Sequence, residues 1–128
     1  MGTGTSIGRV RGLGAAREGT HHWWHQRLTA GGNLLLVVWF LASVARLPAY
    51  DAATVQIWLS SPWAAIPMAL LVLNLFYHAR LGLQIAIEDY AHREGGTVLL
   101  VLLNLVTVVG AAIGVFSILK IAFTGASA

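Results

Sequence analysis

Residues 97–119 read TVLLVLLNLVTVVGAAIGVFSIL, a run of 23 positions that contains no Asp, Glu, Lys or Arg. A helix needs about 20 predominantly apolar residues to cross the hydrocarbon core of a bilayer. Residues 28–45 and 52–79 also lack these four residue types. The sequence therefore predicts an all-α membrane protein with three transmembrane helices, at about residues 27–46, 62–89 and 97–120.

The composition of the whole chain agrees with a membrane protein. Of its 128 residues, 57% are hydrophobic and 10% are charged, whereas about a quarter of the residues of a soluble domain are charged. The chain has no cysteine, which excludes disulfides, thiolate metal sites and cysteine nucleophiles. Residues 1–20 are rich in glycine and show neither helical nor strand periodicity, so they are predicted to form a flexible cytoplasmic tail.

The distribution of basic residues predicts the topology. Four arginines precede the first span: Arg9, Arg11, Arg17 and Arg27. Arg93 falls on the same side, whereas Arg46 and Lys120 fall on the other. Because cytoplasmic loops carry the excess of Lys and Arg, the N-terminus is predicted to be cytoplasmic and the C-terminus periplasmic. A basic arm can also bind nucleic acid, but its place beside a span favours the topological role, and no nucleic-acid partner is expected.

His78 is the most informative polar residue in the second span. It lies ten residues before Glu88, so it is about 15 Å from the cytoplasmic end of the helix and near the bilayer midplane. An ionisable residue at this depth serves an ion, a proton or a cofactor, or else hydrogen-bonds a neighbouring helix. Haem is a suitable cofactor, because imidazole commonly ligates its iron. Gly82, one turn away, would let a flat macrocycle approach, although ordinary helix packing is the alternative.

No second histidine lies within a span, so the other axial ligand of such a haem would come from a different subunit. Asp89 follows His78 by eleven residues, or almost three turns, so it shares the face of His78 about 16 Å nearer the cytoplasm. Tyr90 lies beside it. A phenol that hydrogen-bonds a carbonyl oxygen, next to a carboxylate, suits the reduction of a quinone. Alternatively, the run Glu88-Asp89-Tyr90 is simply the solvated end of a helix.

Two segments resemble the small hydrophobic membrane-anchor subunit of succinate dehydrogenase. Residues 19–30, GTHHWWHQRLTA, are similar to the family's segment before its first span, with its Arg-x-Thr-Ala ending. Residues 78–92, HARLGLQIAIEDYAH, are similar to its second helix, in which a haem-ligating His precedes an Asp-Tyr pair by this spacing. The resemblance implies that residues 21–128 form a membrane-anchor domain, one half of a heterodimeric haem-binding helical bundle.

The resemblance also implies roles for individual residues. His78 would be an axial ligand of haem b, shared with a larger cytochrome b anchor subunit. Arg27 and, more weakly, His21 would contact the haem propionates, although Arg27 could also be a helix-end arginine that snorkels. Tyr90 would hydrogen-bond ubiquinone, supported by Asp89. The chain would not be catalytic alone. It would anchor an iron–sulfur subunit and a flavoprotein subunit that oxidise succinate.

Two other functions are compatible with the same residues. The chain could be the anchor of another quinone-linked haem b complex, such as fumarate reductase. It could also be a small channel or transporter subunit in which His78, Arg80 and Asp89 form a proton path. Arg80 lies about 200° around the helix from His78 and would pair with another subunit's carboxylate or snorkel to the surface. A bacterial inner membrane is expected rather than a mitochondrial one, because the tail is short and poor in serine.

Overall fold

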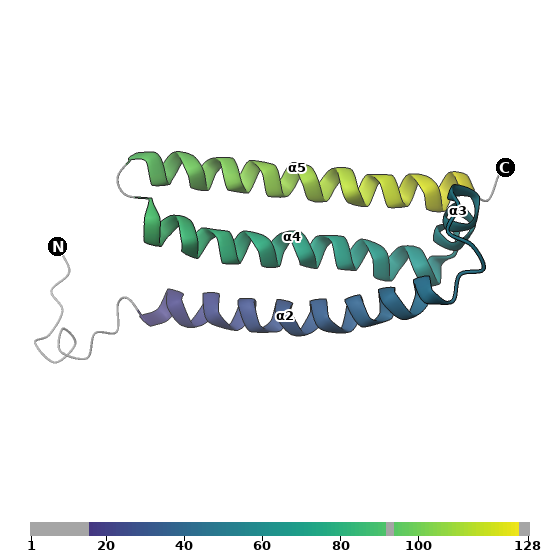
Figure 1. The fold of residues 1–128 in the computed structure, drawn as a ribbon. Helices are drawn as coiled ribbons and strands as arrows, with labels where there is room; N and C mark the ends of the chain where they lie inside the picture. The colour runs from purple at the N-terminus through teal and green to yellow at the C-terminus, as the bar shows by residue number, and fades with distance from the viewer. Residues whose placement is uncertain (1–15, 92–93, 126–128) are drawn as a thin grey trace, which may run out of the picture.

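The computed structural model describes residues 16–91 and 94–125. These residues form four helices, α2 (Ala16–Ala45), α3 (Ala52–Ser60), α4 (Pro62–Tyr90) and α5 (Glu94–Thr124), as Figure 1 shows. Three segments are long and apolar enough to cross a membrane: Gly19–Ala45, Pro62–Tyr90 and Gly95–Thr124. The predicted all-α fold with three spans is confirmed. Most of the predicted tail, residues 1–20, lies outside the described residues, and its described part is already helical from Ala16.

The short helix α3 is not predicted by the sequence, because the uncharged block 52–79 runs through both α3 and the first half of α4. The two helices are separated at Ser61, whose backbone is extended with φ −79° and ψ 129°. Pro62 explains this break, since a proline disfavours the α conformation of the residue before it. Pro62 can begin α4 without the loss of a hydrogen bond, because the N–H at the first helical position has no intrahelical partner.

A serine hydroxyl commonly caps the free amides at the start of a helix, but neither Ser60 nor Ser61 does so for α4. Ser61 occupies the N-cap position, but its side chain makes no capping hydrogen bond. The Ser60 hydroxyl instead donates to the carbonyl oxygen of Ile57 at 2.7 Å. Pro67 lies within α4, which continues through it to Tyr90.

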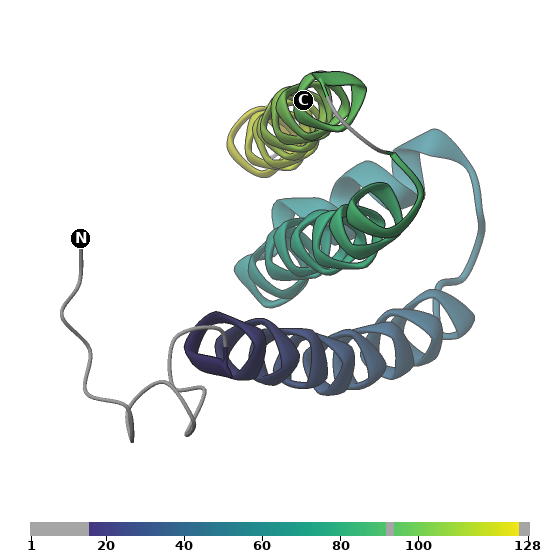
Figure 2. The same cartoon turned by 90° about the vertical axis from the view of Figure 1, so that its left-hand side faces the viewer.

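The three long helices form a flat layer with α4 in the middle. Helix α4 packs against both α2 and α5, whereas the backbones of α2 and α5 do not approach each other within the described residues (Figures 1 and 2). A layer of this shape encloses almost no core, and none of the large side chains described is fully buried. The apolar surface of both open faces must therefore be covered by lipid or by other helices.

The contact between α4 and α5 depends on two glycines of α5. A Cβ atom at Gly110 would lie 2.6 Å from the Phe76 ring, and one at Gly114 would lie 2.8 Å from a methyl group of Val72. Small residues let neighbouring transmembrane helices approach closely. The two glycines therefore allow α5 to approach α4 closely.

Helix α3 closes the far end of the layer. Leu59 of α3 is buried with Ala65 of α4 and Ile118 of α5. Trp58 of α3 also stacks on Trp39 of α2, with ring centroids 6.0 Å apart and planes inclined by 23°. One short helix therefore contacts all three long ones at this end.

Candidate functional site

Four polar side chains meet between α2 and α4, about midway along both helices, and we call them the polar seam: Thr29, Asn33, Asn74 and His78. On each helix the two members are four residues apart and so lie on one face. The Thr29 hydroxyl oxygen is 2.9 Å from Nδ1 of His78. The Asn74 amide nitrogen donates to the carbonyl oxygen of Thr29 and to Oδ1 of Asn33, both at 2.9 Å. The seam therefore ties α2 to α4 through side chains and backbone.

Two glycines border the seam. A Cβ atom at Gly32 would lie 3.0 Å from the amide nitrogen of Asn74, so the absence of a side chain makes room for that amide. At Gly82, predicted to face either a macrocycle or a helix, a Cβ atom would have the Gln26 amide of α2 at 3.7 Å. Gly82 therefore lies beside α2, at a distance of ordinary contact.

The two residues predicted to contact haem propionates lie near the start of α2 but on different faces. Six positions separate them, which is about 240° around a helix. The Arg27 guanidinium lies 5.3 Å from the centroid of the Trp23 ring, a cation–π distance. The His21 ring lies 5.7 Å from that of His25, which in turn makes an edge contact with Tyr77 across the interface to α4. The structure does not bring Arg27 and His21 together within this chain.

Asp89 and Tyr90, the residues predicted to bind quinone, lie at the end of α4. Both are exposed, and 86% of the Tyr90 surface is accessible. Neither side chain forms a hydrogen bond or an ion pair with the rest of the described chain. The preceding Glu88 differs, because its carboxylate accepts a hydrogen bond from Gln84 at 2.8 Å. Asp89 and Tyr90 are therefore available to groups outside the chain.

Arg80 has a partner that the sequence does not predict. Its Nε atom donates to Oδ1 of Asn104 on α5, whose own amide nitrogen donates to the Leu100 carbonyl at 2.8 Å. An asparagine within the third apolar span is the available signal for this pairing. Arg80 therefore faces α5, on the side of α4 away from the polar seam.

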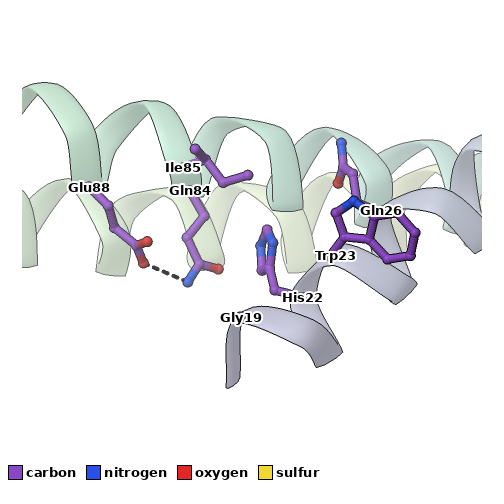
Figure 3. A pocket seen from close by; sticks show the side chains of 7 residues that line it. All are labelled: Gly19, His22, Trp23, Gln26, Gln84, Ile85 and Glu88. Carbon is purple, nitrogen blue, oxygen red and sulfur yellow. Dashed lines mark hydrogen bonds between the residues drawn. The ribbon is translucent and has the colours of Figure 1, made fainter. Parts of the chain in front are cut away.

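A cleft opens between the start of α2 and the end of α4, the two helix ends that are predicted to face the cytoplasm (Figure 3). It has a volume of about 540 Å³ and is lined by Gly19, His22, Trp23, Gln26, Gln84, Ile85 and Glu88. The Nε2 atom of His22 and the Oε1 atom of Gln26 are buried without a hydrogen-bond partner. Since buried polar atoms are normally paired, the cleft suits a hydrogen-bonding group from outside the chain. The sequence does not predict it.

Within residues 16–91 and 94–125, no three metal-ligating side chains gather into a site. A metal that arrives in a macrocycle has a different requirement, since the ring supplies most of the ligands and the protein adds one or two axial ones. A single imidazole in an apolar span meets that requirement. Three spans with one such imidazole at the inner helix contact define a multi-pass membrane protein with a candidate cofactor ligand.

Comparison with known proteins identifies the family. The chain belongs to the succinate dehydrogenase/fumarate reductase transmembrane subunit family, whose model matches residues 1–114. It is 33% identical over 115 residues to the succinate dehydrogenase hydrophobic membrane anchor subunit of Rickettsia bellii, which covers 86% of this chain and 91% of the relative. It is also 33% identical over 88 residues to the subunit of the same description from Paracoccus denitrificans, covering 69% of this chain and 67% of that one. No solved structure gives a significant match.

The family resemblance that the sequence suggests is therefore confirmed. The chain is a membrane subunit of an oxidoreductase complex, and its partners are the other subunits of that complex and the lipid bilayer.

Proposed function

We propose that this chain is the membrane-anchor subunit of a succinate:ubiquinone oxidoreductase and that His78 ligates a haem b shared with a larger anchor subunit. The observation that supports this most is the environment of His78. An imidazole lies in the middle of an apolar span, and one of its two ring nitrogens is held by the Thr29 hydroxyl at 2.9 Å. The names of the relatives favour succinate dehydrogenase over fumarate reductase.

The residues of this chain fit a haem. With Nδ1 of His78 bonded to Thr29, the other nitrogen, Nε2, is the one that can bind iron. Metal-ligating histidines usually bond their second nitrogen in this way, which fixes the orientation of the ring. When bound, haem b would carry single electrons. The other histidines of the described chain, His21, His22 and His25, lie in about the first three turns of α2 rather than at mid-span, so the second axial ligand would come from the larger anchor subunit.

The flat layer supports a role as half of a larger bundle. An apolar groove of about 820 Å³ runs along α2 and α4 and includes Gly31, Gly32 and Asn74. Glycines on a transmembrane helix let another helix approach closely. Helices of the larger anchor subunit would cover this open face, whereas lipid would cover the rest of the layer.

Ubiquinone would bind at the end of α4. Tyr90 would donate a hydrogen bond from its phenol to a quinone carbonyl oxygen, and Asp89 would exchange protons with water beside it. The exposure of both side chains supports this, because a quinone needs access from outside the chain. The iron–sulfur and flavoprotein subunits would dock at the same end, on the cytoplasmic face of a bacterial inner membrane, with the C-terminus periplasmic.

The arrangement of polar residues argues against a proton path as the function of this chain. His78 contacts α2, whereas Arg80 contacts α5 on the other side of α4. Asp89 lies at the exposed helix end. A proton path would require these groups to line one continuous channel, which their separation on opposite sides of α4 does not provide.

The test is optical. The tagged chain is purified with its native partners, and a dithionite-reduced minus oxidised spectrum is recorded. We expect a b-type band that is lost in His78→Ala and kept in His25→Ala, a matched histidine at the start of α2. A preparation that contains the flavoprotein but no b-type band, or a His78→Ala complex with a full band, would refute the haem assignment.

A further inference from the structure

Thr29 is the one buried polar residue among the described side chains, with 7% of its surface exposed. Its hydroxyl oxygen lies at the centre of three short contacts. It is 2.7 Å from the carbonyl oxygen of His25, 3.2 Å from that of Gln26 and 2.9 Å from Nδ1 of His78. Only His78 belongs to the other helix.

The hydroxyl has a single proton, which can be donated to one strong partner. The 2.7 Å separation between the Thr29 hydroxyl and the His25 carbonyl requires a proton between the two oxygens, since lone pairs would otherwise repel at this distance. The hydroxyl therefore donates to His25. It follows that the contact with His78 runs the other way, with Nδ1–H of the imidazole donating to the hydroxyl oxygen.

The position of the hydroxyl is itself fixed from α4. The Asn74 amide, one turn before His78, donates to the backbone carbonyl of Thr29 at 2.9 Å. The backbone carbonyl of Thr29 is thus bonded to Asn74, and its hydroxyl is in contact with His78 one turn further along α4. Rotation or sliding of α2 against α4 would break both contacts together.

We propose that Thr29 is a positioning residue that sets the tautomer of His78, with the proton on Nδ1 and the lone pair on Nε2. This inference rests on the proposed function, in which Nε2 binds haem iron. An imidazole that donates its second N–H to an oxygen is a better metal ligand, and loss of such a partner typically lowers metal affinity about 10–100-fold. Thr29 touches neither iron nor quinone in this role and acts only through His78.

The first experiment compares variants of the purified complex. Thr29→Val removes the oxygen and keeps the branched shape, whereas Thr29→Ser keeps the oxygen. Thr107→Val is a matched control, because the Thr107 hydroxyl makes the same intrahelical bond, to the Leu103 carbonyl at 2.7 Å, in α5. We expect the Thr29→Val complex to bind haem with about 10–100-fold lower affinity, seen as loss of haem during washing. We also expect its haem midpoint potential to shift. Thr29→Ser and Thr107→Val should match the original complex.

The second experiment reads the tautomer without haem or activity. The full-length chain is labelled with ¹⁵N-histidine and placed in lipid nanodiscs, and the His78 signals are assigned by comparison with His78→Gln. In the original chain we expect a protonated Nδ1 and an unprotonated Nε2. In Thr29→Val we expect a larger population of the tautomer with the proton on Nε2. A proton on Nε2 in the original chain would overturn the inference, even where Thr29→Val fails to assemble.

The outcomes separate the two proposals. A complex that loses haem in His78→Ala but keeps normal haem retention and potential in Thr29→Val would overturn the role of Thr29 and leave the haem ligand intact. A complex with no b-type haem would overturn the proposed haem site, whereas the NMR result would still decide the tautomer.

Discussion

The amide nitrogen of Asn74 on α4 lies 2.9 Å from the backbone carbonyl of Thr29 and 2.9 Å from the side-chain oxygen of Asn33, both on α2. Polar contacts between transmembrane helices contribute about 0.6 kcal/mol each on average. Asn74→Leu removes both, so we expect the free energy of unfolding to fall by about 1 kcal/mol, measured by equilibrium unfolding of the complex in bicelles. Ser117→Ala is the control, since the exposed Ser117 hydroxyl bonds within its own helix, to the Ile113 carbonyl. Equal effects of the two substitutions would contradict a stabilising seam.

Gly110 on α5 has no room for a side chain. A Cβ atom there would lie 2.6 Å from the Phe76 ring, so Gly110→Ala should lower the free energy of unfolding by about 1–3 kcal/mol, as overpacking usually does. Gly95→Ala is the control, because a Cβ atom at Gly95 would have no neighbour within 4 Å among the described residues. We also expect Phe76→Leu to recover part of the loss in the Gly110→Ala background. Failure of this rescue would show that the ring is not the obstacle.

The Arg80 and Asn104 side chains should prove energetically coupled. The hydrogen bond from Arg80 to Asn104 satisfies a charged group within an apolar span. We expect Arg80→Met and Asn104→Leu, measured singly and together by thermal unfolding, to show a coupling energy of about 0.5–3 kcal/mol. Strictly additive effects would mean that Arg80 is stabilised by something other than Asn104.

Tyr90→Phe tests the proposed quinone site. Loss of one hydrogen bond of about 0.5–1.5 kcal/mol predicts a fall in succinate–quinone turnover of up to about tenfold. Succinate oxidation with an artificial soluble acceptor should remain unchanged, because it bypasses the membrane subunits. Tyr77→Phe serves as the control, since Tyr77 packs against His25 through its ring. A parallel loss of both activities would indicate an assembly defect.

The loop before α3 offers a pH-dependent prediction outside the spans. The Thr54 hydroxyl donates to the Asp51 carboxylate at 2.6 Å and lowers the pKa of Asp51 below its ordinary value. A lowered pKa means that this bond supports the start of α3 above the ordinary carboxyl range and is lost as the pH falls through the lowered value. We expect Thr54→Val to raise the pKa of Asp51, measured by NMR titration in detergent. An unchanged pKa would exclude the hydroxyl as its cause.

The spans can be predicted from the sequence because a charge-free stretch of sufficient length has few other uses. The same criterion hides the break at Ser61, since α3 and the start of α4 are equally free of charge. Pro62 is the local signal for the break. A proline is equally compatible with the first turn of a single span, so Pro62 alone does not predict a separate helix before it. Hydropathy alone therefore gives three spans and misses the fourth helix.

The polar seam can be predicted only in part. His78 stands out because an ionisable residue is rare at mid-span, but nothing in the sequence pairs it with Thr29. Pairing depends on which faces of α2 and α4 meet, and helices that are apolar on all sides carry little periodic signal of that orientation. For the same reason, the sequence does not predict that Arg80 pairs with Asn104 of α5. The roles of Arg27, His21, Asp89 and Tyr90 stay predictions, to be tested in the complete complex.

The two close contacts between α4 and α5 have a consequence for how the chain can change over time. At Gly110 and Gly114 the absence of a side chain is matched by the bulk of Phe76 and Val72 on the facing helix. A larger side chain on one helix can therefore be accommodated at each contact only if the facing side chain becomes smaller. Among relatives, a larger residue at position 110 or 114 should be accompanied by a smaller one opposite, so that each pair changes as a single unit.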